Sequence, residues 1–115
     1  MIFGTQFKQG EILIVPFPFS NLNSIKQRPV LVLSKNNYNR ISNDIIVCGI
    51  TSNLKDNKYS VIIDNDCLLN GKIPLKSRIK VDKLFTLEKK LVKKKIGLVN
   101  VNILTQVKKE IEKLI

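Results

Sequence analysis

Two side chains able to bind a phosphate group stand beside predicted strands. Arg28 is followed by Pro29, which fixes the local backbone, and then by the apolar run 30–33. An arginine held in this way presents a planar, permanently charged fork to two phosphate oxygens. A second apolar run, 45–50, ends at the hydroxyl of Thr51. Two strands that deliver an arginine and a hydroxyl are more typical of a site than of a scaffold, although an arginine at the start of a strand is often only a solvated surface residue.

The chain contains no histidine. This composition excludes Ser-His-Asp and Cys-His catalysis, metal sites built on histidine, and RNA cleavage by a pair of histidines. Any chemistry must therefore use arginine, lysine, hydroxyl or carboxylate groups.

Positive charge is concentrated in the C-terminal part of the chain. There are 20 Lys and Arg against 9 Asp and Glu, a net charge of +11. Residues 72–115 contain 13 basic and 4 acidic side chains, whereas residues 1–71 contain 7 and 5. This balance predicts a polyanion or an acidic protein as partner. No apolar run approaches the roughly 20 residues that span a bilayer. The N-terminus also lacks a signal-peptide pattern, so we expect a cytoplasmic protein without a membrane partner.

The two cysteines are Cys48, in an apolar run, and Cys67, in a polar stretch. They form no CxxC motif, so a zinc site is not expected. Because cytosolic thiols stay reduced, we expect free cysteines rather than a disulfide.

Alternating and apolar runs predict five or six short strands in a single domain, residues 1–115. Pro16 and Pro18 are expected to interrupt the first strand, and a bulge or bend is expected between residues 82 and 84. Residues 35–43 and 67–76 are expected to be irregular, and Gly97 to end the last strand. The predicted strands are 10–15, about 28–34, 44–51, 59–63, 77–82 and 91–96.

The C-terminal tail has the spacing of an amphipathic helix. Leu104, Val107, Ile111 and Leu114 recur at steps of three and four, and Asn102 is placed as an N-cap. Short strands and one terminal helix predict a mainly β fold, a small curled antiparallel barrel.

Four ordered segments, covering residues 8–99, resemble the MazF/PemK toxins, the endoribonucleases of type II toxin–antitoxin pairs. The segments are Gly10-Glu11-Ile12 with Pro16-Phe17-Pro18-Phe19, Arg28-Pro29-Val30-Leu31-Val32-Leu33, Ile50-Thr51-Ser52, and Ser77-Arg78-Ile79-Lys80-Val81-Asp82-Lys83-Leu84-Phe85-Thr86-Leu87.

The resemblance implies an SH3-like barrel with a C-terminal helix, working as a homodimer that an acidic antitoxin neutralises. It implies cleavage of single-stranded RNA without a metal or other cofactor, leaving a 2′,3′-cyclic phosphate and a 5′-hydroxyl. The catalytic arginine and threonine of the family fall on Arg28 and Thr51. Arg28 would supply charge and two parallel donors, and Thr51 would position the phosphate or the 2′-OH.

Further residues are candidates for substrate binding. Phe17 and Phe19 suit base stacking, although core packing explains an aromatic residue there equally well. The loop before Arg28 and the residues after Thr51 are placed to contact RNA, and the family has a polar substrate contact where Lys83 stands. The substrate-binding candidates are Phe17, Ser20, Asn21, Lys26, Gln27, Ser52, Asn53 and Lys83.

Two other functions are also compatible with this sequence. A CcdB-like toxin that inhibits gyrase would share the fold without a phosphate-directed pair. A basic barrel that only binds nucleic acid would show salt-dependent duplex binding and no cleavage.

Overall fold

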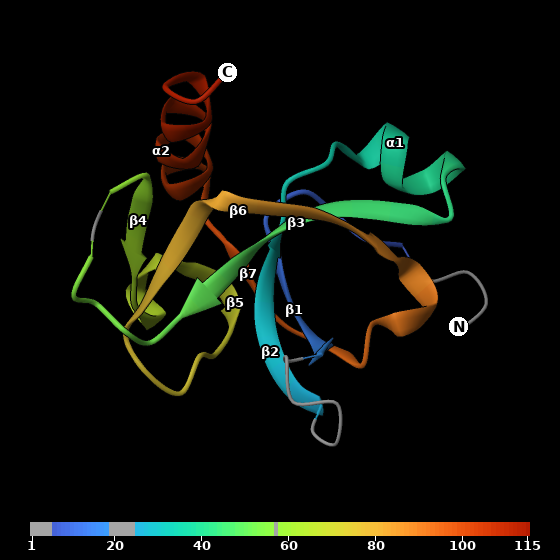
Figure 1. Cartoon of the computed structure of the whole chain (residues 1–115), viewed down its shortest axis with the longest axis horizontal. Helices are drawn as coiled ribbons and strands as arrows, with labels where there is room; N and C mark the ends of the chain where they lie inside the picture. Colours follow the sequence, from blue (N-terminus) through green and yellow to red (C-terminus); the bar gives the residue numbers. More distant parts are fainter. Residues whose placement is uncertain (1–5, 19–24, 57) are drawn as a thin grey trace.

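A strongly curled antiparallel sheet forms most of the molecule (Figure 1). The computed structural model describes residues 6–18, 25–56 and 58–115. Within them the sheet has seven strands in the order β4-β6-β3-β2-β1-β7-β5. Three of the strands, β2, β3 and β6, surround the candidate site. The strands are β1 Glu11–Pro18, β2 Ile25–Val32, β3 Asp44–Thr51, β4 Ser60–Ile63, β5 Leu68–Gly71, β6 Ser77–Glu88 and β7 Lys94–Val99.

Alternate residues of the central strands enter two different hydrophobic clusters. The first lies on the face covered by helix α2 (Val101–Glu112), which buries Ile103 and Val107 against the sheet. The second lies on the opposite face and includes Phe7. Each buried Val, Leu or Ile contributes about 1.5–3 kcal/mol to stability. The first cluster takes Leu31, Cys48, Ile50 and Ile79, and the second takes Val30, Val32, Ile45, Val47 and Leu87.

The first strand does not stop at Pro16. β1 pairs with β2 as far as Pro18, whereas it pairs with β7 only over residues 11–14. A proline, which has no N–H to donate, is tolerated in a strand where one side lacks a pairing partner. The prediction that Pro16 interrupts the strand was wrong. β2 also begins and ends earlier than the predicted 28–34.

Residues 35–43 were predicted to be a loop, but helix α1 (Asn36–Ile41) lies there. Asn39, only 1% exposed, donates to the backbone carbonyls of Phe7 and Ser34. The contact with Phe7 joins the helix to a distant part of the chain. Because Asn-rich stretches favour turns by local preference, the sequence alone did not indicate this helix.

The predicted irregular segment 67–76 contains β5, and Gly97 lies inside β7 rather than at its end. Gly97 pairs with Ile12 on one side and Gly71 on the other. Gly71 has φ +79°, a conformation that glycine adopts without strain. Two facing glycines therefore let β5 and β7 approach closely.

The C-terminal helix is present, but its N-cap is Asn100 rather than Asn102. The Asn100 side chain accepts a hydrogen bond of 2.9 Å from the Ile103 N–H. Leu104, Val107 and Ile111 pack toward the first cluster, as their spacing predicted, while Leu114 lies beyond the helix.

In the structure Cys48 and Cys67 are free thiols, and Cys48 is buried. Burial, with a smaller contribution from Asp82, raises the pKa of the Cys48 thiol to about 12.

We expect the free energy of unfolding to fall as pH rises above about 9. Between the pKa of the unfolded thiol and that of folded Cys48, unfolding releases one proton, so this thiol contributes a slope of up to about −1.4 kcal/mol per pH unit. Urea titrations at several pH values measure it. A Cys48→Ala variant should lose that component, and an identical slope in both proteins would contradict the assignment.

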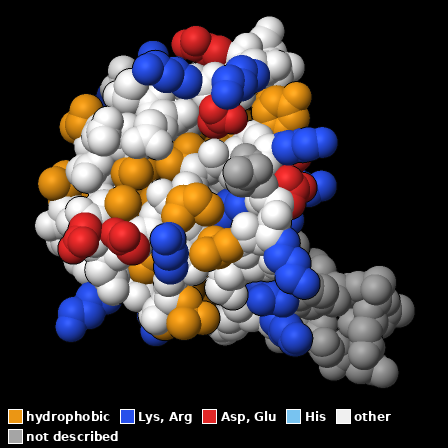
Figure 2. Space-filling view, turned by 90° about the vertical axis from the view of Figure 1, so that its left-hand side faces the viewer, with side chains coloured by type: hydrophobic (Ala, Val, Ile, Leu, Met, Phe, Trp, Pro, Cys, Tyr) orange, Lys and Arg blue, Asp and Glu red, His pale blue; other side chains and the backbone are white. Residues whose placement is uncertain are grey.

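Exposed apolar side chains gather on the side of the molecule that carries β4, β5 and α2 (Figure 2). The large exposed hydrophobic residues from the segments between β3 and β6 are Leu54, Tyr59, Ile62, Leu69 and Leu75.

None of the helices in the described ranges is long and apolar enough to cross a membrane.

Candidate phosphate-binding site

The site begins where β2 and β3 separate. These strands pair only over residues 30–32 and 47–49. Pro29 has no N–H to extend a ladder toward β3. The chain therefore leaves Arg28 and Pro29 on one side of a gap, with Ile50 and Thr51 on the other.

A bulge in β6 adds two lysines to this gap. Cys48 pairs with Leu84, but the next residue, Gly49, pairs with Lys80, so residues 81–83 are looped out of the ladder. The prediction of a bulge near residues 82–84 is confirmed. Because of it, both Lys80 and Lys83 line the same pocket.

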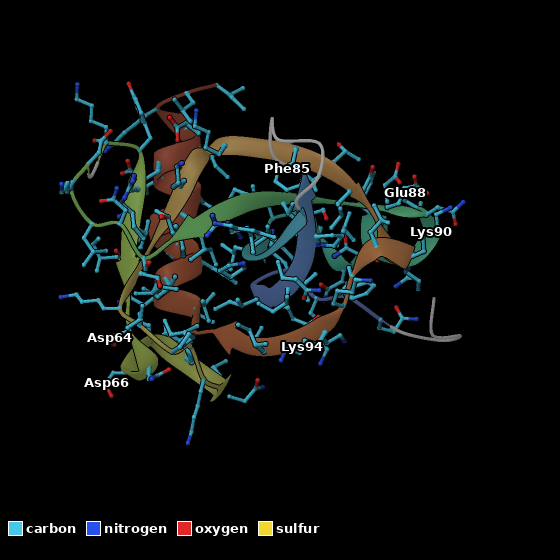
Figure 3. All side chains as sticks on the ribbon, turned by 60° about the horizontal axis from the view of Figure 1, so that its bottom comes forward. Asp64, Asp66, Phe85, Glu88, Lys90 and Lys94 are labelled. Carbon is cyan, nitrogen blue, oxygen red and sulfur yellow. The ribbon has the colours of Figure 1, made fainter. Side chains whose placement is uncertain are left out.

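The resulting pocket has a volume of about 430 Å³. Its described lining contains three cationic side chains and no carboxylate. Phe85 supplies an aromatic wall, and Asp64 and Asp66 lie apart from it at the β4–β5 end of the sheet (Figure 3). An anionic ligand with an apolar or aromatic part fits this lining. The lining residues are Arg28, Pro29, Gly49, Ile50, Thr51, Lys80, Lys83, Leu84 and Phe85.

The Thr51 hydroxyl is oriented by the backbone that follows it. The Asn53 N–H donates to Thr51 Oγ1 over 3.1 Å. A hydroxyl has one proton and two lone pairs, so this bond occupies a lone pair and leaves the proton available. Thr51 is thus arranged to donate a hydrogen bond, which suits a positioning role rather than that of a base.

The structure brings together three of the predicted site residues, Arg28, Thr51 and Lys83. Arg28 is exposed on β2, Thr51 half-buried at the end of β3, and Lys83 exposed in the β6 bulge.

The other candidates lie around the pocket or outside the described part. Lys26 and Gln27 are exposed on β2, and Ser52 and Asn53 are exposed after β3; none of these four lines the pocket. Phe17 belongs to β1 by its backbone, opposite Lys26. Ser20 and Asn21, like Phe19, lie outside the described residues.

Sequence reasoning did not single out Lys80 and Phe85, although both line the pocket. Lys80 is one of the polar positions of the alternating run 77–82, which only showed that its side chain leaves the core. Lys80 shares a face of the sheet with Thr51 because it pairs with Gly49, two residues before Thr51 on β3. The register between β6 and β3 cannot be predicted from the sequence of one strand.

The sequence model of a protein family, the PemK-like, MazF-like toxins of type II toxin–antitoxin systems, matches residues 8–115 of this chain. The chain belongs to this family. The match includes β2, β3 and the whole of β6, and so every residue that lines the pocket.

Several solved structures share the fold of this chain at low sequence identity. A MazE–MazF complex from Deinococcus radiodurans (form II) superposes with a TM-score of 0.77 at 19% identity, over 96% of both chains. An endoribonuclease from a mycobacterial species gives 0.75 at 18% identity, over 96% of this chain and 92% of that one. A mycobacterial endoribonuclease in complex with its cognate antitoxin gives 0.70 at 17%, over 92% and 91%. Among curated protein sequences, none matches this chain significantly.

Proposed function

We propose that this toxin is an endoribonuclease that cuts single-stranded RNA through attack of the RNA's own 2′-OH, without a metal ion. The products are a 2′,3′-cyclic phosphate and a 5′-hydroxyl. The observation that carries the proposal is the shared pocket of Arg28 and Thr51, lined by two further cations and no carboxylate among the described residues. Such a lining attracts a phosphodiester and would repel neither of its charged oxygens.

The chemistry asks for charge and hydrogen bonds rather than for a bound nucleophile. As the 2′-oxygen attacks, negative charge grows on the two non-bridging oxygens of the phosphorane. Arg28 can donate two parallel hydrogen bonds to them, and Thr51 can donate a third. Lys80 and Lys83 add positive charge at the same pocket, which lowers the cost of that developing charge.

The proposed partners follow from charge and from relatives. An acidic antitoxin suits a chain of net charge +11, because complementary charge speeds encounter. The similar structures include a MazE–MazF complex and an endoribonuclease bound to its antitoxin. We propose that the chain acts in the cytoplasm as a homodimer that such an antitoxin neutralises.

The proposed activity is tested with purified protein and a labelled single-stranded RNA in excess EDTA. We expect cleavage to fragments with 5′-hydroxyl ends, which a 5′-kinase labels without prior phosphatase treatment. RNA carrying a 2′-deoxy nucleotide at the cut position should resist cleavage, because its nucleophile is missing.

Other outcomes separate the alternatives. Cleavage of the 2′-deoxy substrate, or dependence on added metal, would contradict the proposed chemistry. Gyrase inhibition without RNA cleavage would favour a CcdB-like toxin. Salt-dependent duplex binding without cleavage would favour a simple binding module.

A further inference from the structure

Arg78 is a buried arginine outside the pocket lining. It lies on β6 opposite Thr51 of β3 and is only 7% exposed. Its Nε donates to the Asn53 backbone carbonyl over 3.0 Å, and its Nη1 donates to Ser60 Oγ over 2.9 Å. Ser60 Oγ in turn donates to the Lys58 carbonyl over 2.7 Å. Arg78 therefore holds both ends of the segment that connects β3 to β4.

This arginine has no carboxylate partner among the ion pairs of the described residues. Burying an unpaired charge is unfavourable, and hydrogen bonds to neutral acceptors compensate only in part. A neutral residue of similar size would serve packing at lower cost. The contacts of the guanidinium are more readily explained by what they hold in place than by stability.

Asn53, whose carbonyl accepts from Arg78, also contacts Thr51 in the pocket lining. The Asn53 carbonyl that accepts from Arg78 and the Asn53 N–H that donates to Thr51 Oγ1 flank the same Cα. Only φ and ψ of Asn53 separate the two groups, so fixing the carbonyl also restricts the N–H. The orientation of the Thr51 hydroxyl thus depends on Arg78 through one residue.

We propose that Arg78 is a positioning residue of the reaction, one that orients the Thr51 hydroxyl through the Asn53 backbone. This inference rests on the proposed function, since it assigns a role within the same site. Arg78 is not among the residues that line the pocket, so its proposed contribution is made through Thr51. Its removal should therefore slow the chemical step more than it weakens RNA binding.

The test is a double-mutant cycle of Arg78→Met and Thr51→Val, measured as single-turnover RNA cleavage below the melting temperature of every variant. We expect Arg78→Met to lower the single-turnover rate constant at saturating enzyme about tenfold, while the enzyme concentration that gives half of that rate changes less than threefold. In the Thr51→Val background the same change should cost less than twofold, because the hydroxyl that it orients is gone. Effects that multiply fully in the double mutant would overturn the inference.

Arg40→Met is the matched control, since Arg40 is exposed on α1 and bonds only Asn37 among the described hydrogen bonds. It should leave the single-turnover rate constant and the half-saturating enzyme concentration unchanged. A second readout is the 15N spectrum. Arg78→Met should shift the Asn53 amide signal, whereas Arg40→Met should not; an unshifted Asn53 signal would also overturn the inference.

Failures of the two proposals are distinguishable. A wild-type protein that does not cleave RNA removes the proposed function, and this role with it. A wild-type protein that cleaves, with an Arg78→Met effect that multiplies that of Thr51→Val, removes this role alone.

Discussion

Replacing Arg28 with alanine should lower kcat/KM for RNA cleavage by at least about 100-fold, the loss seen when one donor to a developing oxyanion is removed. Arg28 is the one arginine in the described pocket lining. Its planar fork can meet two phosphate oxygens at once, and alanine removes both the charge and the geometry. Because Arg28 is exposed, we expect the fold and the melting temperature to change little.

Two variants make this measurement specific. Arg28→Lys keeps the charge but not the fork, so it should recover only part of the lost activity. Arg40→Ala removes an exposed arginine on α1 and should leave cleavage unchanged. Full activity in a folded Arg28→Ala protein would show that the site is elsewhere.

The largest expected loss of stability comes from Gly71→Ala. A Cβ at this position would lie 2.0 Å from the Ile96 carbonyl oxygen and 2.5 Å from the Gly97 Cα. These are backbone atoms, so the contact is relieved only if β5 moves away from β7. The positive φ of Gly71 adds a cost of about 1–2 kcal/mol for any side chain. We expect the free energy of unfolding to fall by about 3 kcal/mol or more, as measured by urea denaturation.

Gly49→Ala is the matched control for stability. The nearest atom to a Cβ there is Lys83 Cβ at 4.0 Å, an ordinary contact. Its free energy of unfolding should stay within about 1 kcal/mol of the wild type. Equal stability of the Gly71→Ala and Gly49→Ala proteins would contradict the close approach of β5 and β7.

The local sequence pattern was sufficient to predict the elements whose own apolar residues show where they lie. β3 coincides with the predicted 44–51, because its apolar run and its ending at Thr51 are both visible in the chain. The β6 bulge was visible as a phase slip in the alternation. Helix α1 and strand β5 were not predicted, since each depends on distant partners: Asn39 on Phe7, and Gly71 on Gly97.

The pocket residues also divide into those predicted from local motifs and those placed only by strand pairing. Arg28 and Thr51 were predicted from ordered motifs, and both line one pocket in the structure. Lys80 was not found, because only the pairing of β6 with β3 places it opposite Gly49. The burial of Arg78 was not predicted either, because an arginine in an alternating strand has the same sequence pattern as a solvent-facing polar residue.

The cationic lining has a thermodynamic consequence for the unoccupied protein. Arg28, Lys80 and Lys83 place three positive charges around one pocket. Folding brings these charges together, so the native state has a higher electrostatic free energy than it would have with a neutral lining. Any bound anion lowers it, whether the anion belongs to a nucleic acid or to an acidic protein. An anion that binds in the pocket should therefore raise the melting temperature of the protein.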